Sequence, residues 1–387
     1  MDWKIPLFKI YWDDEDIEMV KKSIQRGMFW ASGPNIEKFE GMLSEYTGRR
    51  YVVVFNSGTS ALHAILLAYE IGQGDEVIVP SFTFIATANA PLFVGAKPVF
   101  ADIEETNYGL DPDSVMRKIT PKTKAIIPVH YGGCPCLIKE LKEIAEEHNL
   151  ILIEDAAESF GAKRNGKKVG TFGDSAMFSL CQTKVFTTGE GGFIVTDSQD
   201  ICERLKLIRS HGRAETTDYF SSVEYMDYVT LGYNFRMPDI IAALGISQLK
   251  KVDRLIEMRR NNSKYMTKAV SGIKDITIPE FPEEVFHVYQ EYAIRVKAGE
   301  KARDSLRAHL TRRGIMTRVS FYPVHLTHFY KNVLGYENTS LDVTENVSSQ
   351  ALTLPMYPSI TKDEMDYIAQ EIHNFFKGAK FDESPSR

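Results

Sequence analysis

The chain has 387 residues, of which 43% are hydrophobic and 25% are charged, a composition typical of a globular protein with one large core and one smaller one. Its net charge of −6 provides no general attraction to nucleic acids or to anionic membranes, so we expect neither as a partner. Residues 1–18 lack the cationic and apolar segments of a leader, and no apolar run is long enough to span a bilayer. The expected location is therefore cytoplasmic.

Predicted strands alternate with predicted helices from about residue 50 to about residue 210. The strand-like runs are short and rich in β-branched and aromatic residues, as expected where both faces of a sheet are covered. They span 51–56, 75–82, 98–103, 124–131, 150–156, 175–180 and 191–197, and apolar residues recur at helical spacing in 61–70 and 137–149. This order predicts an α/β fold with a mainly parallel sheet flanked by helices.

The second half of the chain changes character. A polar and aromatic stretch from about residue 213 to about 236 is too long for a routine connection, which suggests a functional segment. A long helix is predicted next, with Pro238 in its first turn. We predict a large domain over residues 1–260, including an N-terminal arm and this connecting helix, and a smaller α+β domain over residues 261–387.

The four cysteines are too few and too irregularly spaced for a disulfide framework. Cys134 and Cys136 are separated by one residue, which is not the spacing of zinc or thioredoxin-like sites. We expect both to be small buried residues, and we expect no metal site.

The segment Ser57-Gly58-Thr59-Ser60 joins a predicted strand to a predicted helix. The first N–H groups of a helix have no partner within it and lie at the positive end of its dipole, so they could bind a phosphate. Serine and threonine are also ordinary helix caps, and the motif alone favours a cap. It matches neither a nucleotide P-loop nor a dinucleotide-binding motif.

Asp155 ends the apolar run LILIE, which places a carboxylate at the carboxyl edge of a parallel sheet, where ligands bind in such folds. A pyridine nitrogen beside it would remain protonated, because a nearby anion stabilises the cation. The alternative, a helix N-cap before residues 156–161, is equally compatible with this residue alone.

Lys184 lies between the apolar segment MFSL and the glycine-rich turn TTGEGG. A lysine amine that has lost its proton can attack an aldehyde, and burial near another cation favours that state. Ser179 is either a strand-end residue or a second phosphate contact, and the turn allows close backbone approach or positive φ. Phosphate cradle, pyridinium partner and amine follow one another in the order that a pyridoxal-phosphate (PLP) enzyme needs.

Seven segments, SGTSALHAILLA, PSFTFIATANA, PVHYGG, IEDAAESFGA, GDSAMFSL, TKVFTTGEGG and YNFRMPDIIAALG, resemble the DegT-type sugar aminotransferases, also called the DnrJ/StrS family. The resemblance covers nearly the whole chain. It implies a fold-type-I PLP transferase and a homodimer with each active site at the subunit interface. The implied reaction moves an amino group, usually from glutamate, to a keto sugar carried on a nucleotide.

The resemblance also assigns cofactor-binding residues. Lys184 matches the lysine that forms the Schiff base, and Asp155 matches the partner of the pyridine nitrogen. The phosphate contacts correspond to Gly58, Thr59, Ser60 and Ser179, and Phe84 matches the aromatic side chain that stacks on the ring.

Other assignments by resemblance are less direct. Asn234 matches a residue that reaches the same phosphate from the neighbouring subunit, although a turn residue before a helix would look alike. Glu158 falls beside the cofactor's phenolic oxygen, where an ionised carboxylate could only accept hydrogen bonds, so its protonation state is open. Tyr322 and His325 resemble a loop that borders the sugar pocket, and packing residues would give the same pattern.

The resulting hypothesis is a ping-pong aminotransferase, with pyridoxamine phosphate as the intermediate cofactor form. Relatives that dehydrate sugars carry histidine at the position of Lys184, so the lysine favours transamination. Resemblance inclines the prediction toward C4 of a 4-keto-6-deoxy sugar. Two alternatives remain: a keto-cyclitol substrate from aminocyclitol biosynthesis, and a non-catalytic regulatory protein that kept the fold.

Overall fold

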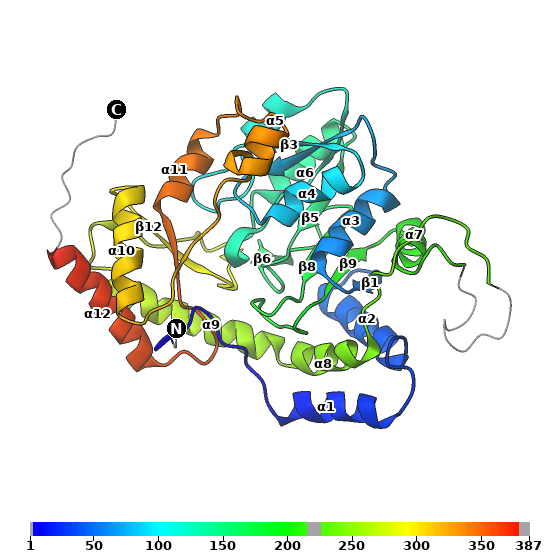
Figure 1. Cartoon of the computed structure of the whole chain (residues 1–387), viewed down its shortest axis with the longest axis horizontal. Helices are drawn as coiled ribbons and strands as arrows, with labels where there is room; N and C mark the ends of the chain where they lie inside the picture. The colour runs from blue at the N-terminus through cyan, green and yellow to red at the C-terminus, as the bar shows by residue number, and fades with distance from the viewer. Residues whose placement is uncertain (1–2, 215–225, 379–387) are drawn as a thin grey trace.

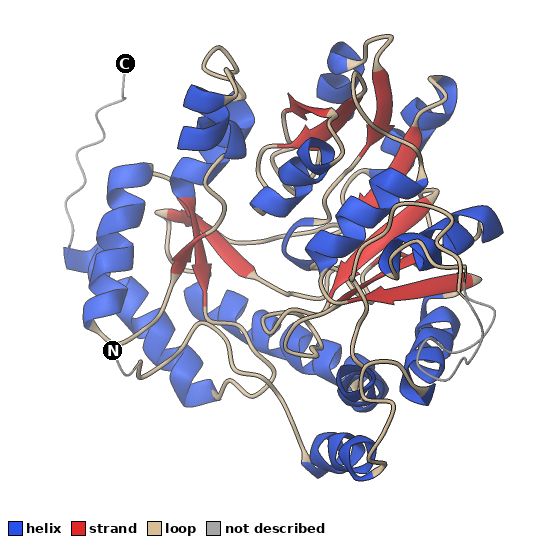
Figure 2. Ribbon diagram, turned by 45° about the vertical axis from the view of Figure 1, so that its right-hand side comes forward, coloured by secondary structure: helices blue, strands red, loops and turns tan. Residues whose placement is uncertain are grey.

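The computed structural model describes residues 3–214 and 226–378. Two main groups of strands, each with its own helices, are joined by a pair of helices along one side of the molecule (Figures 1 and 2). Residues 215–225, which belong to the predicted functional segment, lie outside the described ranges.

The larger sheet has seven strands in the order β1-β9-β8-β5-β4-β2-β3. Of these seven, β9 runs antiparallel to both of its neighbours, and the other pairings are parallel, which confirms the mainly parallel sheet. The strands are β1 (Tyr51–Phe55), β2 (Glu76–Pro80), β3 (Lys97–Ala101), β4 (Thr123–Ile126), β5 (Ile151–Asp155), β8 (Ser175–Ser179) and β9 (Gly192–Thr196).

Helices cover both faces of this sheet. Alternate residues of β1 show the layers, since Val53 packs in one core with Leu62 of α3 whereas Val54 packs in another with Phe39 of α2. The helices around the sheet are α2 (Pro34–Thr47), α3 (Gly58–Ala68), α4 (Ile85–Phe93), α5 (Pro112–Lys118), α6 (Ile138–Glu147), α7 (Gln199–Arg209) and α8 (Asp239–Lys250). Within the described ranges, no helix combines the length and apolarity needed to cross a bilayer.

The second group is an antiparallel sheet of four short strands in the order β10-β12-β14-β13. Its strands are β10 (Ile276–Thr277), β12 (Tyr292–Val296), β13 (Arg318–Val319) and β14 (Ala351–Leu354), and its helices are α9 (Val252–Val270), α10 (Glu300–Arg312), α11 (Asp342–Gln350) and α12 (Lys362–Gly378). A third sheet joins β6 (Lys163–Arg164) with β7 (Lys167–Lys168) and β11 (Val285–Phe286), and short helical turns occur at Tyr131–Gly133, Val324–Leu326 and Phe329–Val333. The domain division at residue 260 stays a prediction.

The predicted long connecting helix is two helices. Helix α8 ends at Lys250 and α9 begins at Val252, and Pro238 caps α8 from outside its first turn. The side chain of Lys251, at the junction, is paired with Asp13 and Asp16 at the start of α1 (Asp14–Gln25). Helix α1 lies alongside α8, and Leu255 and Met266 place the two ends of α9 in different cores (Figure 1).

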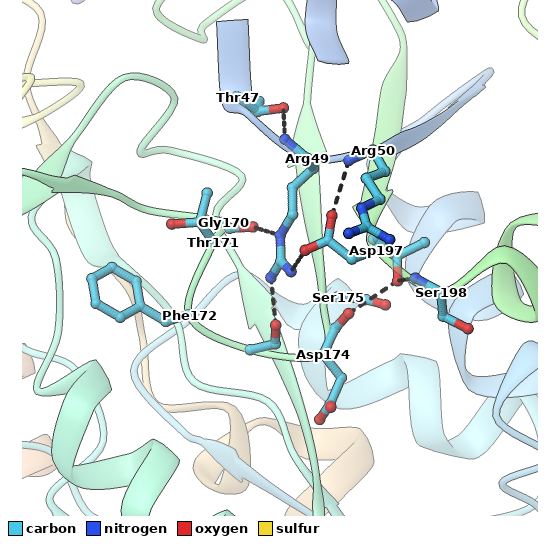
Figure 3. Close-up of polar contacts among 12 residues, drawn as sticks. Thr47, Arg49, Arg50, Gly170, Thr171, Phe172, Asp174, Ser175, Asp197 and Ser198 are labelled. Carbon is cyan, nitrogen blue, oxygen red and sulfur yellow. Dashed lines mark hydrogen bonds and ion pairs between the residues drawn. The ribbon is translucent and has the colours of Figure 1, made fainter. Parts of the chain in front are cut away.

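The loop before β8 is tied to the start of β1 by Arg49 (Figure 3). The guanidinium donates to the carbonyl oxygens of Gly170, at 2.9 Å, and Gly173, and it pairs with Asp197 at 2.8 Å. The N–H groups of Gly170 and Gly173 donate to Glu154. In this loop, therefore, Arg49 binds buried carbonyl groups and Glu154 binds buried N–H groups.

Candidate active site

Lys184 lies in the loop between β8 and β9, where its backbone N–H donates to the carbonyl of Cys181 at 2.9 Å. Its side chain is 16% exposed, and Nζ lies 3.2 Å from Oε1 of Glu158. The other oxygen of Glu158 accepts a hydrogen bond from the N–H of Gly132 at 2.8 Å. Lys184 is thus a partly buried amine held by a buried acid.

The surroundings of the acid beside Lys184 favour its ionised form. Burial opposes ionisation, but the Lys184 ammonium, the Gly132 N–H and the charge of Arg318 together hold the pKa of Glu158 below its usual value. In this arrangement Glu158 accepts hydrogen bonds and donates none.

Asp155 ends β5 and is 3% exposed. Its oxygens accept hydrogen bonds from the Thr87 hydroxyl at 2.8 Å and from the Ala157 N–H at 3.1 Å. The latter closes a turn, and no helix begins there, so the N-cap alternative is wrong. Burial raises the pKa of Asp155, and these hydrogen bonds and the Lys184 charge oppose the shift without cancelling it. A cation placed beside it would favour ionisation.

The predicted phosphate residues come together at the start of α3. Ser57 caps the helix by accepting from the Ser60 N–H at 3.0 Å, so it has the cap role. A Cβ added at Gly58 would lie 3.2 Å from Cβ of Ser179, and one added at Gly192 would lie 2.5 Å from the Gly58 nitrogen. The order β1-β9-β8 therefore brings the glycine-rich turn and Ser179 against the helix N-terminus, while Gly189 has φ +85°.

Phe84 and Asn234 lie at the surface. Phe84 is 62% exposed and precedes α4, and the adjacent Thr83 hydroxyl lies 2.8 Å from that of Thr87, which donates to Asp155. The exposed Asn234 lies beside the end of β1, where its carbonyl accepts from the Asn56 amide at 3.4 Å. A stacking role for Phe84 and a contact of Asn234 across subunits stay predictions.

The two sugar-pocket residues differ in environment. Tyr322 is 58% exposed. His325 is fully buried, with Nδ1 2.7 Å from the Ser81 hydroxyl and Nε2 3.2 Å from Glu345. Both nitrogens of His325 are occupied by protein groups, which is the packing arrangement that the sequence left open.

The sequence did not reveal several residues that hold the site. Thr87 orients Asp155, and the buried Tyr131 and Glu291 form a polar cluster with the partly exposed Arg318 next to Glu158. One sequence signal was available for Glu291, because a Gln-Glu pair interrupts the apolar run HVYQEYAIRV. The buried state of Cys134 and Cys136 confirms the expectation for the cysteines.

These groups fit PLP. The buried carboxyl of Asp155 has only two donors among the described residues, so it can accept the N–H of a pyridinium. The N-terminus of α3 with Ser179 suits a phosphate, and the charge of Lys184 acts on both Asp155 and Glu158. Fold and site together define a PLP-dependent enzyme.

The chain belongs to the DegT/DnrJ/EryC1/StrS aminotransferase family, whose model matches residues 11–373. Among its relatives, GDP-perosamine synthase of Escherichia coli O157:H7 is 35% identical over 96% of this chain and 98% of the relative. The protein is accordingly a PLP-dependent aminotransferase.

Solved structures support the same assignment. Helicobacter pylori PseC, an aminotransferase involved in pseudoaminic acid biosynthesis, superimposes with a TM-score of 0.91 at 27% identity, covering 97% of this chain and all of that one. The PLP-form of the putative sugar aminotransferase Spr1654 from Streptococcus pneumoniae gives a TM-score of 0.89 at 28% identity, with 97% and 98% covered. The predicted fold class and cofactor are confirmed.

Proposed function

We propose that this aminotransferase moves an amino group from glutamate to a nucleotide-linked keto sugar, and that the acceptor is a 4-keto-6-deoxy sugar. The observation that carries the proposal is the 35% identity to GDP-perosamine synthase across almost the full length of both chains. The ordered cluster of Lys184, Asp155 and Glu158 supports catalysis rather than a purely regulatory role.

Each residue of the cluster has a distinct task in the proposed reaction. Bound PLP supplies an aldehyde that can exchange amino groups and a ring that can accept an electron pair. Lys184 provides the amine that holds the cofactor, and its Nζ carries the proton between carbon atoms when it is free. Asp155 keeps the ring nitrogen protonated, and Thr87 fixes the carboxylate for that purpose.

The proposal includes a homodimer with shared active sites. Asn234 and Phe84 are exposed in the isolated subunit although both match cofactor contacts. A second subunit placed over this surface would cover Phe84 and bring its own Asn234 to the phosphate site. Under this proposal neither site is complete in a monomer.

Product analysis tests the reaction. The cofactor-loaded enzyme is incubated with glutamate that carries a labelled amino nitrogen and with a panel of 3-keto and 4-keto nucleotide sugars and inososes. We expect mass spectrometry to find the label in an amino sugar formed from a 4-keto-6-deoxy nucleotide sugar. Label in an aminocyclitol would establish the keto-cyclitol alternative, and no labelled product with any acceptor would contradict the proposal.

A further inference from the structure

An arginine is held at the boundary between the two main sheets by a buried glutamate. Arg318, on β13, donates from Nη2 to Oε1 of Glu291, which precedes β12 and is 7% exposed. The other carboxylate oxygen of Glu291 accepts from the Tyr131 hydroxyl and from the Thr353 hydroxyl, each at 3.1 Å. Hydrogen bonds from three side chains therefore hold Glu291 in place, and Glu291 in turn holds one end of the Arg318 guanidinium.

This arginine is connected to the lysine through backbone groups. The Glu291 N–H donates to the Gly132 carbonyl at 3.0 Å, and the Gly132 N–H donates to Glu158, which pairs with Lys184. Arg318 and Thr183, the neighbour of Lys184, line one small cavity of about 30 Å³, enough for a single water molecule. The charge of Arg318 also contributes to the lowered pKa of Glu158.

An anionic substrate needs a cation in this cluster other than Lys184. The cluster has three carboxyl groups and two cations, Lys184 and Arg318. Burial raises the pKa of Asp155 and of Glu291, whereas the two cations help to hold the pKa of Glu158 below its usual value. In the proposed function the amine of Lys184 is engaged with the cofactor. Of the two cations in this cluster, Arg318 would then be left to receive an incoming carboxylate, and it is 42% exposed with donors beyond the one that Glu291 uses.

We propose that Arg318 binds a carboxylate of the amino donor and that Glu291 is the positioning residue that aims its guanidinium. The inference rests on the proposed function and adds a substrate contact to it. In an amino acid the α-carboxylate is attached to the carbon that bears the reacting amine, so its cation must lie close to Lys184. The diphosphate of a nucleotide sugar is separated from the keto carbon by the sugar ring and requires a more distant cation.

Arg318→Gln tests the proposal in the cofactor-loaded enzyme. Titration of the visible cofactor absorbance gives the Kd of glutamate, which we expect to rise roughly 10- to 100-fold, the loss of a charged hydrogen-bonding partner. The KM of the keto sugar should stay within about twofold, which is a change of less than 0.5 kcal/mol. Calorimetry with glutarate, a dicarboxylate that cannot react, should show the same weakening as glutamate.

Matched variants separate binding from folding. Arg313→Gln removes another partly exposed arginine that pairs with a buried acid, Glu371, at 3.1 Å, and it should leave the Kd of glutamate unchanged. Arg318→Lys keeps the charge without the planar guanidinium and should give an intermediate Kd.

Glu291→Gln should raise the Kd less than Arg318→Gln, with kcat nearly unchanged. Combining Glu291→Gln with Arg318→Gln removes both charges, so this variant folds without a buried unpaired acid.

The outcomes are distinct. An unchanged glutamate Kd in Arg318→Gln, or a loss confined to the KM of the nucleotide sugar, would overturn the inference while leaving the proposed function intact. A wild-type enzyme whose spectrum does not respond to glutamate would instead contradict the proposed function.

Discussion

Two neighbouring carboxylates on β5, Glu154 and Asp155, point to opposite faces of the sheet and have opposite environments. Glu154 accepts from the N–H groups of Gly170, Phe172 and Gly173 and lies 3.0 Å from Nε2 of His130. Within the described ranges, Asp155 accepts from two donors, the Thr87 hydroxyl and the Ala157 N–H. Burial opposes ionisation of both, but its four donors hold the pKa of Glu154 below the usual value, whereas the pKa of Asp155 is raised.

The difference separates an acid whose partners are all protein groups from one that we propose binds the cofactor. Since the Cys136 N–H donates to Nδ1 of His130, the His130 proton lies on Nε2 and faces Glu154. Glu154 therefore has its bonding capacity filled by protein. Together with Arg49, whose contacts Figure 3 shows, it fixes the loop 170–173. Asp155 retains capacity that a ligand can fill. Of two acids that are equally buried, the one with fewer protein hydrogen-bond donors keeps the capacity to bind a ligand.

The largest effect is expected from Asp155→Asn. An amide cannot keep the pyridine nitrogen protonated, so turnover should fall roughly 10³-fold, as when other charge-stabilising groups are removed from active sites. Without cofactor the same variant should be more stable than the wild type by about 1 kcal/mol at pH 7, because it buries no charge. Since the raised pKa lowers wild-type stability as pH rises, this gain should grow above about pH 4. Turnover assays and urea unfolding of the cofactor-free protein measure both.

A variant that lost stability while keeping its turnover would reverse the comparison, because Asp155 would then be the structural acid.

Glu154→Gln should act on stability. Its amide nitrogen would oppose at least one of the backbone N–H donors, and we expect a loss of about 3 kcal/mol in the free energy of unfolding. Urea unfolding measures the loss, and the exposed Glu147→Gln on α6 is the control. The turnover of the folded fraction should change far less than in Asp155→Asn. A neutral stability effect would mean that the loop 170–173 does not depend on Glu154.

The smallest effect is the pH dependence of Glu158→Gln. A carboxyl with a lowered folded pKa contributes stability above its ordinary pKa of about 4.5 and loses it as the pH falls through the folded value. At pH 7 the variant should be less stable than the wild type by about 1 kcal/mol, the cost of losing the Lys184 and Gly132 contacts. Calorimetric melting from pH 7 to pH 3 should show the gap closing. A gap that widens on acidification would mean that Glu158 is protonated in the folded protein.

How much of this structure the sequence predicts depends on how far apart the interacting residues lie along the chain. Asp155 was recognisable because it lies near the end of a predicted strand, and Lys184 because it lies in the loop shortly after another, and the parallel sheet aligns strand ends. The contact of Gly58 with Ser179 depends on the strand order β1-β9-β8, which the sequence analysis did not predict. The local pattern could not distinguish a helix cap from a turn at Asp155, which depends on where the next helix begins.

The supporting residues were not predictable from local pattern. Tyr131 and Glu291 are 160 positions apart, and their hydrogen bond exists only because the two main sheets pack together. In the sequence, Thr87 is a polar residue within an apolar helix, and only the structure shows that it donates a hydrogen bond to Asp155. The break between α8 and α9 was not predicted for the same reason. Lys251, at this junction, pairs with Asp13 and Asp16, which are far away in the sequence.

The proposed role of Lys184 can be tested by identifying the lysine that holds the cofactor. The PLP-loaded enzyme is reduced with borohydride, digested with trypsin and analysed by mass spectrometry. We expect a phosphopyridoxyl group on Lys184, with tryptic cleavage blocked after that residue, and no attachment in Lys184→Ala. Attachment to a different lysine of the wild-type chain, or no attachment at all, would contradict it.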